Sequence, residues 1–221
     1  RQSRVGAVTT LRMPVVWTDR HRGHAPDGGY WLGVRLAGDE EPERGDALRD
    51  QLLAAGATLV DAPDFGLAPI LAVHDAAFVD CLQRAYPEWV AAGHLVDPGQ
   101  PQVVPYIFAM PGLVARATRV RPPATIRAEI GLYATDTLTL ISEGTFAAAR
   151  AAVHASVHAA SLVADGAPAA YAAVRPPGHH AARASFGGSC YFNNAAAAAQ
   201  HLRDRGVPRV AVIDIDAHQG N

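Results

Sequence analysis

Short apolar runs alternate with longer stretches of helical periodicity along most of the chain. The runs are rich in β-branched and small residues, which is typical of buried strands, at residues 14–17 (PVVW), 57–60 (ATLV), 169–174 (AAYAAV) and 209–216 (RVAVIDID). Between them the spacing predicts helices over residues 42–55, 72–86, 143–165 and 193–205, the last capped by an asparagine. This alternation predicts a single α/β domain with a mainly parallel sheet.

Two segments depart from this alternation. Residues 87–123 are rich in proline and glycine without clear periodicity, which predicts a long excursion, and we expect any homodimer to form through it. Residues 1–12 precede Met13, where the regular pattern begins, and we expect them to be a non-native or disordered leader. We therefore assign the domain to residues 13–221.

Polar side chains gather where two of the predicted strands end. Asp214 and Asp216 are two residues apart, so on a strand they project to the same face, and His218 follows on the loop. His179 and His180 follow the strand at 169–174, in a loop made rigid by two prolines. Because ligands of open parallel sheets bind beyond the carboxyl ends of the strands, the two clusters should be neighbours.

These side chains admit a chemical and a structural interpretation. Carboxylates with an imidazole suit a divalent ion such as zinc, and paired histidines suit proton transfer near neutral pH, so together they could activate water. The alternative is that the aspartates cap backbone amides and the histidines are merely exposed. His154 and His158, four residues apart on the alanine-rich helix, are interpreted as a surface feature, and Tyr191 and Phe192 as core.

Composition narrows the class of protein. The chain of 221 residues is 49% hydrophobic and 18% charged with a net charge of −2, so we expect a globular domain with no nucleic-acid partner and no membrane partner. Cys81 and Cys190 are too few for a disulfide framework, and no apolar signal core precedes the domain. These features favour a cytoplasmic location.

Three motifs, taken together, resemble one known family. RPPGHHA (175–181), GGSCYFNNAA (187–196) and VAVIDIDAHQGN (210–221), in this order, are similar to the zinc-dependent histone deacetylase superfamily. The stretches at residues 69–89 and 131–145 look most like its bacterial acetylpolyamine amidohydrolase and class II branch. The resemblance implies an arginase-like three-layer α/β/α fold, and zinc-dependent removal of acetyl groups from a small acetylated amine or acetyl-lysine.

The resemblance also implies roles for individual residues. Asp216 and His218 match two of the family's three zinc ligands, and Asp214 matches an aspartate that orients His179 and helps to hold a monovalent cation such as K⁺. His180 matches the general base, and His179 the histidine that protonates the leaving amine.

Further matches concern the surroundings of the site. Asn221 falls where class II members carry an asparagine that orients the second histidine. Arg44 matches an arginine of an internal channel, Gly188 lies at the wall of the substrate tunnel, and Ser189 replaces a residue that is usually aromatic.

The resemblance places the family's third zinc ligand and its oxyanion tyrosine beyond Asn221. We therefore expect an incomplete C-terminal part of the fold, and a chain that by itself binds zinc poorly and is inactive. Two other functions stay open. One is a binuclear manganese ureohydrolase of the arginase type, against which Gly220 argues because that class carries an aspartate there. The other is a binding module that captures an acylated amine without hydrolysing it.

Overall fold

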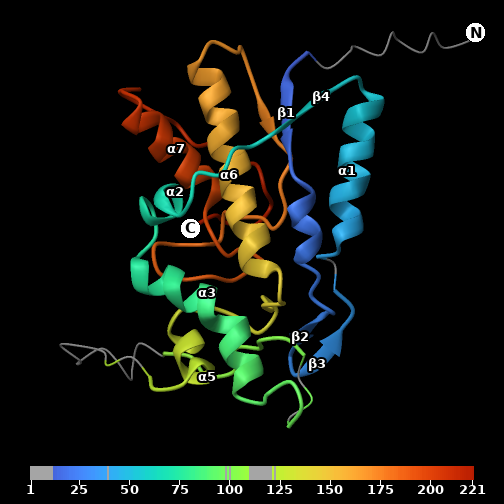
Figure 1. Cartoon of the computed structure of the whole chain (residues 1–221), viewed down its shortest axis with the longest axis vertical. Helices are drawn as coiled ribbons and strands as arrows, with labels where there is room; N and C mark the ends of the chain where they lie inside the picture. Colours follow the sequence, from blue (N-terminus) through green and yellow to red (C-terminus); the bar gives the residue numbers. More distant parts are fainter. Residues whose placement is uncertain (1–11, 39, 98, 100, 110–120, 122) are drawn as a thin grey trace, which may run out of the picture.

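A parallel sheet forms the centre of the upper half of the molecule (Figure 1). The computed structural model describes residues 12–38, 40–97, 99, 101–109, 121 and 123–221, so the predicted leader, Arg12 excepted, lies outside the described residues. Strand β1 (Pro14–Trp17) lies between β4 (Thr58–Asp61) and β5 (Tyr171–Ala172) and is parallel to both. The predicted α/β class with a parallel sheet is confirmed.

Helices cover both faces of this sheet, with α1 (Pro42–Ala54) on one side of β1 and α6 (Thr145–Ala164) on the other (Figure 1). Successive residues of a strand point to opposite faces, and β1 shows this directly. Val15 and Trp17 form a core with Leu52 of α1, whereas Val16 packs among the alanines of α6. The three-layer arrangement therefore follows from a period of two in the β1 sequence.

Helix α6 is alanine-rich, and its small side chains allow close packing against α7 (Asn194–Asp204). The predicted cap of α7 is confirmed, because Asn193 Oδ1 accepts the Ala196 N–H at 2.9 Å. The prediction that His154 lies at the surface is wrong. His154 is 3% exposed, and its Nε2 donates to the Gly66 carbonyl at 2.8 Å.

The largest apolar core lies away from the two clusters at β1. It joins α2 (Ala68–Leu71), α3 (Ala76–Ala91), α5 (Ile126–Glu129) and the short helix η2 (Ile130–Leu132) to α6, α7 and the aromatic side chains of residues 186–192. The helix predicted at 72–86 corresponds to α3, which begins at Ala76 and continues to Ala91, while residues 72–75 connect it to α2. The predicted excursion begins later than Pro87, because α3 continues through Pro87 while Trp89 is buried in the core. Burial of such a side chain can outweigh a single lost helical hydrogen bond.

Two small elements connect β1 to α1. The short helix η1 (Asp19–Gly23) follows β1, and an antiparallel hairpin of β2 (Gly29–Trp31) and β3 (Val34–Leu36) comes next. Gly45 of α1 lies directly against the His21 ring, since an added Cβ there would be 2.7 Å from His21 Cε1. A glycine is therefore what lets η1 and α1 approach each other.

The buried strand predicted at 209–216 is the main correction to the predicted fold. The segment forms no strand and no described strand pairs with it, and Ile213 and Ile215 are 84% and 94% exposed. A strand of a parallel sheet is buried only when it has a paired neighbour and cover on both faces. The apolar sequence of this segment suits a buried strand. Among the described residues, however, it has neither a neighbouring strand nor cover on both faces.

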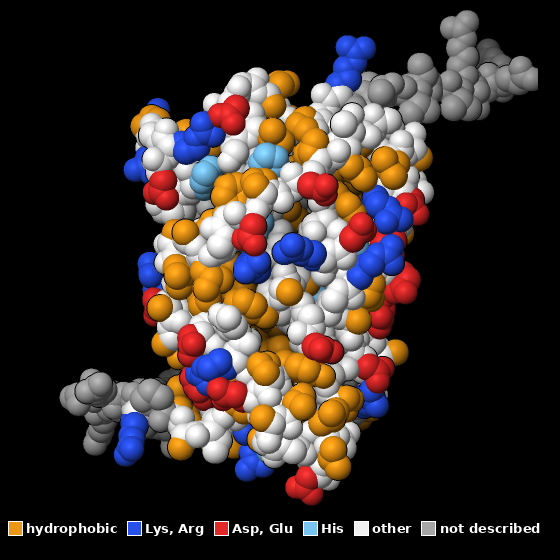
Figure 2. Space-filling view, viewed as in Figure 1, with side chains coloured by type: hydrophobic (Ala, Val, Ile, Leu, Met, Phe, Trp, Pro, Cys, Tyr) orange, Lys and Arg blue, Asp and Glu red, His pale blue; other side chains and the backbone are white. Residues whose placement is uncertain are grey.

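The surface carries mixed charge. On the face in Figure 2, acidic and basic side chains are interspersed among apolar patches, in keeping with the small net charge. None of the helices in the described part of the chain is both long and apolar enough to cross a membrane.

Candidate active site

The two polar clusters predicted from the sequence do meet. The rings of His179 and His180 lie 4.0 Å apart, centre to centre, and the ring of His218 is 6.1 Å from that of His180. His179 Nδ1 is 2.9 Å from Asp214 Oδ2, which joins residues 35 positions apart in the chain. Loops after two neighbouring segments therefore bring imidazole and carboxylate groups into one small volume.

The two aspartates also bind backbone amides, as the structural interpretation anticipated. Asp214 Oδ1 accepts the Asp216 N–H at 3.0 Å, and Asp216 Oδ1 accepts the His218 N–H at 2.7 Å. The Asp216 amide and the His179 ring lower the pKa of Asp214, and the amide and ring of His218 lower the pKa of Asp216. Both side chains are thus held as carboxylates, the form in which they accept a proton donor or a cation.

The donor types in this segment fit zinc, although their number is small. Asp216 and His218 offer one carboxylate and one imidazole, and the His218 ring Nδ1 lies 3.0 Å from Asp216 Oδ1. Among the described residues, no three His, Cys, Asp or Glu side chains are grouped closely enough to hold a metal ion. A catalytic zinc ion normally has three protein ligands, so these two residues could contribute to a site without completing one.

Asn221 binds the histidine loop through its backbone. Its N–H donates to the His179 carbonyl at 2.8 Å, and its side-chain amide donates to the His180 carbonyl at 2.5 Å. The expected contact of this amide with the His180 ring is therefore not what the structure contains. The two bonds instead fix the main chain that carries both histidines.

Gly220 has no space for a side chain. An added Cβ would lie 2.5 Å from Asp214 Oδ2, too close for any substitution without movement of that carboxylate. A side chain at position 220 would therefore have to displace the carboxylate that contacts His179.

Gly188 forms the surface against which the His180 ring packs. Its φ is +55°, and an added Cβ would lie 2.2 Å from His180 Cδ2. The Gly188 N–H donates to Asp136 Oδ2 at 2.5 Å, and the Ser189 N–H donates to Thr139 Oγ1 at 2.9 Å. Sequence reasoning missed Asp136, although an aspartate in the turn-forming run ATDTLT is a recognisable sign of an acceptor for backbone amides.

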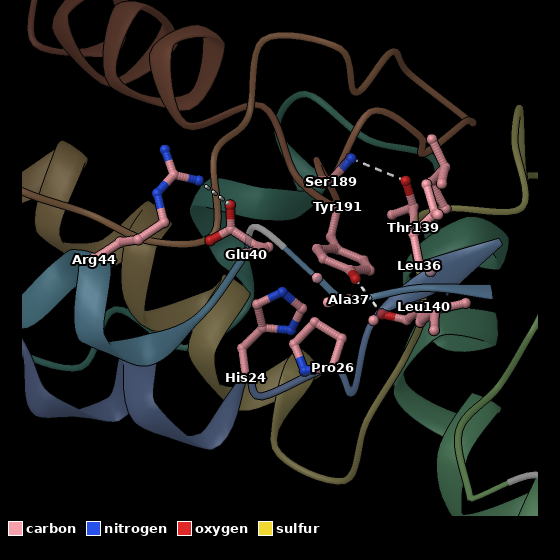
Figure 3. A pocket seen from close by; sticks show the side chains of 14 residues that line it. His24, Pro26, Leu36, Ala37, Glu40, Arg44, Thr139, Leu140, Ser189 and Tyr191 are labelled. Atoms are coloured by element: carbon pink, nitrogen blue, oxygen red, sulfur yellow. Dashed lines mark hydrogen bonds and ion pairs between the residues drawn. The ribbon is translucent and has the colours of Figure 1, made fainter. Parts of the chain in front are cut away.

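Arg44 and Ser189 line one cavity of about 250 Å³ (Figure 3). Figure 3 shows Glu40 next to Arg44, with the His24 ring and the Tyr191 side chain beside them. Arg44 Nη1 is 3.4 Å from Glu40 Oε2, and the Tyr191 hydroxyl donates to the Leu140 carbonyl. The family resemblance implied that Arg44 lies in an internal channel. In the structure, His24, Glu40 and Tyr191 line the same cavity as Arg44.

Glu40, which lines this cavity, also forms a buried ion pair with Arg175. Arg175 Nε lies 2.5 Å from Glu40 Oε1, and Arg175 Nη1 donates to the His21 carbonyl at 2.9 Å. Burial raises the pKa of Glu40, against the opposing effect of Arg175. Sequence reasoning missed Arg175, although it directly precedes the proline–histidine motif, because its burial and its pairing with Glu40 are not visible in the sequence.

His24 is the most deeply buried titratable group of this region. Its Nδ1 is 2.9 Å from Thr145 Oγ1, while its Nε2 has no hydrogen-bond partner in the described part of the chain. Burial, assisted by the nearby Arg175, lowers the pKa of His24 to about 3. The ring is therefore neutral at physiological pH.

Comparison with known proteins agrees with this arrangement. Acetylpolyamine amidohydrolase 2 of Pseudomonas aeruginosa is 39% identical over 210 residues, which cover 95% of this chain and 58% of that protein. The acetylpolyamine amidohydrolase of Mycoplana ramosa is 35% identical over 95% of this chain and 59% of its own length. This chain therefore spans about three fifths of the length of these relatives.

Solved structures show the same relationship. The crystal structure of acetylpolyamine aminohydrolase from Burkholderia pseudomallei matches with a TM-score of 0.77 and 34% identity, covering 87% of this chain and 53% of that one. Residues 39–221 match the family described as the histone deacetylase domain, which confirms the resemblance inferred from the three motifs. The chain thus belongs to the histone deacetylase domain family.

Proposed function

We propose that the protein is a zinc-dependent amidohydrolase that removes acetyl groups from acetylated amines, acetylated polyamines in particular. The observation that carries the proposal is the pair of adjacent histidine rings, the first of which binds a carboxylate. The relatives named as acetylpolyamine amidohydrolases support the choice of substrate class.

The contacts of the two histidines support a division of roles. The Asp214 carboxylate accepts from Nδ1 of His179 and so fixes the tautomer and orientation of the ring, which suits His179 to proton transfer to the leaving amine at Nε2. His180 has no carboxylate among its described ring contacts, and it lies nearer to His218. It therefore suits the general base that takes a proton from the attacking water.

Asp216 and His218 would hold the zinc ion, together with a ligand from outside the described residues. Zinc bound there would polarise the acetyl carbonyl and lower the pKa of a water molecule. Asp214 has a further lone pair on each oxygen beyond the bonds to His179 and Asp216, so it also suits a monovalent cation such as K⁺.

Gly188 and Ser189 would border the alkyl chain of the acetylated amine. A serine offers a smaller and more polar wall than an aromatic side chain, which favours a wide and hydrated tunnel over tight stacking on an alkyl chain. The cavity that contains Arg44 would accept the small carboxylate product, because a guanidinium pairs with a carboxylate.

The experiment that tests this function measures acetate release from an acetylated polyamine. The protein is expressed with any residues that its gene encodes after Asn221, and it is loaded with one equivalent of zinc. We expect His180→Ala to lower turnover about 100-fold or more, because general-base catalysis contributes that much. His158→Ala, a histidine of α6 outside the site, is the matched control.

Metal analysis of the same samples separates the alternatives. One zinc ion per chain fits the deacetylase, whereas two manganese ions would fit the ureohydrolase. Tight binding of an acetylated polyamine without acetate release would instead favour the binding module. For the 221-residue chain alone we expect weak zinc binding and no turnover, and tight stoichiometric zinc in that chain would contradict this expectation.

We also propose that two copies associate through residues 87–123, part of which lies outside the described residues. Apolar side chains exposed in this segment support the proposal, with Val96 84% and Tyr106 49% exposed. Light scattering of the protein and of a Val96→Asp variant tests it. A cytoplasmic location is proposed as well, on the grounds that Cys81 and Cys190 are free and buried.

A further inference from the structure

His74 lies at the junction of α2 and α3, close to the loop of paired histidines. Its side chain is 3% exposed, and it packs against the rings of Phe78 and Phe192 at centre distances of 5.4 and 5.5 Å. No role was assigned to this residue from the sequence. Its surroundings are apolar, so the hydrogen bonds that its two ring nitrogens make are correspondingly important.

The partners of the ring determine its protonation state. Nδ1 lies 2.9 Å from the Ala182 carbonyl, which can only accept, so Nδ1 carries the proton. Nε2 lies 2.9 Å from the Asn193 N–H, which can only donate, so Nε2 offers its lone pair. The two bonds together require a neutral ring with the proton on Nδ1.

These two partners belong to the segments that hold the histidine loop. Ala182 comes two residues after His180, and Asn193 is the residue that caps α7. Asn193 also donates its side-chain amide to the Ala181 carbonyl at 3.0 Å, and the Asp75 N–H donates to the Arg183 carbonyl at 2.9 Å. Residues 181–183 are thus attached to the α2–α3 junction and to the start of α7 at the same time.

We propose that His74 is a positioning residue for His179 and His180, holding their loop in place through its neutral ring. The inference rests on the proposed function, because it assigns His74 a purpose in that site. A doubly protonated ring would direct an N–H at the Asn193 N–H and would break one of the two attachments. The loop should therefore loosen in acid as well as on removal of the ring.

Among the described residues, Arg183 and Asp75 are the charged side chains that act most strongly on His74. Arg183 Nη1 lies 3.4 Å from Asp75 Oδ1, and the two act on the ring in opposite directions. Burial lowers the pKa of His74, against the effect of the carbonyl of Ala182. The neutral ring that both hydrogen bonds require is accordingly the form present at neutral pH.

Three substitutions of His74 separate its two hydrogen bonds. His74→Asn keeps a donor near the position of Nδ1, His74→Gln keeps an acceptor near the position of Nε2, and His74→Leu keeps neither. His154→Leu is the matched control. His154 lies in α6, away from the loop, is equally buried, and also donates to a backbone carbonyl, that of Gly66.

The first readout is hydrogen exchange of the Ala181 and Ala182 amides, which donate to the Gly178 and Ser185 carbonyls. We expect exchange at least tenfold faster in His74→Leu than in His154→Leu, compared at denaturant concentrations that give equal global stability, with intermediate rates in the Asn and Gln variants. The second readout is acetate release, for which we expect a lower kcat and an unchanged KM in His74→Leu, with part of the kcat restored by Asn or Gln.

The outcomes separate this inference from the proposed function. Equal exchange in His74→Leu and His154→Leu, or a kcat that falls equally in both, would overturn the positioning role. If neither the variants nor the unaltered protein, zinc-loaded and expressed with any residues that its gene encodes after Asn221, releases acetate, the proposed function fails, while the exchange data still report whether His74 holds the loop. If His74→Leu does not fold, the Asn and Gln variants provide the same comparison.

Discussion

The histidine loop at 175–180 and the aspartate segment at 209–221 carry the two halves of one candidate site, yet they are held in different ways. The loop is anchored from several sides, by the buried Arg175–Glu40 pair and, just after it, by the bonds of His74 to Ala182 and Asn193. The aspartate segment is mostly exposed and is attached to the loop by the bond of Asp214 to His179 and by the bonds of Asn221.

The histidine loop is therefore preorganised by the core, whereas the aspartate segment is only close to it. Buried side chains on every side fix the backbone of the histidine loop, so the relation between the two imidazoles is set by the core. The aspartate segment has the residues of a metal site but little packing of its own among the described residues. Substitution of the side chains that support the loop should therefore lower the free energy of unfolding. Substitution in the aspartate segment should lower activity and leave the free energy of unfolding unchanged.

The largest effect is expected from Arg175→Met. It leaves the Glu40 carboxylate buried without its nearest cation and removes the donor to the His21 carbonyl, which should lower the free energy of unfolding by about 3–5 kcal/mol. Urea denaturation measures the change. Arg183→Met is the control, since Arg183 is an exposed arginine at the other end of the same loop and should cost less than about 0.5 kcal/mol. Equal losses in both variants would remove the distinction between the two regions.

Acid should lower the free energy of unfolding through protonation of His24. The folded protein holds this ring neutral with a pKa of about 3, while the unfolded chain has an ordinary histidine, so the unfolded state binds more protons below pH 6.5. Lowering the pH from 6.5 to 5 should therefore cost about 2 kcal/mol from this group alone. His24→Asn, which can still bond to Thr145, should reduce the pH dependence by that amount in urea titrations at the two pH values. An unchanged dependence would show that His24 is not buried as described.

Gly188→Ala should cost about 1–3 kcal/mol and displace the His180 ring, because the added methyl group meets that ring and φ is positive. Gly206→Ala is the matched control, since Gly206 also has a positive φ but has no atom near the added Cβ. The excess loss in Gly188→Ala over Gly206→Ala measures the contact with His180. If calorimetry gives the same melting temperature for both variants, the close approach to His180 is not present.

Asp214→Asn tests the aspartate segment and should have the smallest effect on stability. Asp214 is exposed, so we expect little change in the free energy of unfolding. Acetate release by the zinc-loaded protein should nevertheless fall, because the carboxylate that accepts from His179 Nδ1 and orients the ring would be lost. A large loss of stability on this substitution would mean that the two regions are supported alike.

Much of the fold could be predicted from local pattern. The strand at 14–17, the long alanine-rich helix and the asparagine cap of α7 follow from period, propensity and capping, which depend on neighbours in the sequence. The convergence of His179 with Asp214 was also predicted, although that reasoning assumed a strand at 209–216. The described structure has no strand there, and the sequence could not show this, since burial of a strand depends on neighbours far away in the chain.

The sequence by itself determined the family, the α/β class and the residue types of the candidate site, because motifs and periodicity are properties of consecutive residues. Only the tertiary structure decided which side chains support that site. His154 was interpreted as a surface residue and is buried, while His74, His24 and Arg175 owe their bonds to residues roughly a hundred or more positions away. Pairings over such separations depend on how helices and sheet pack together, which the spacing of residues along the chain does not encode.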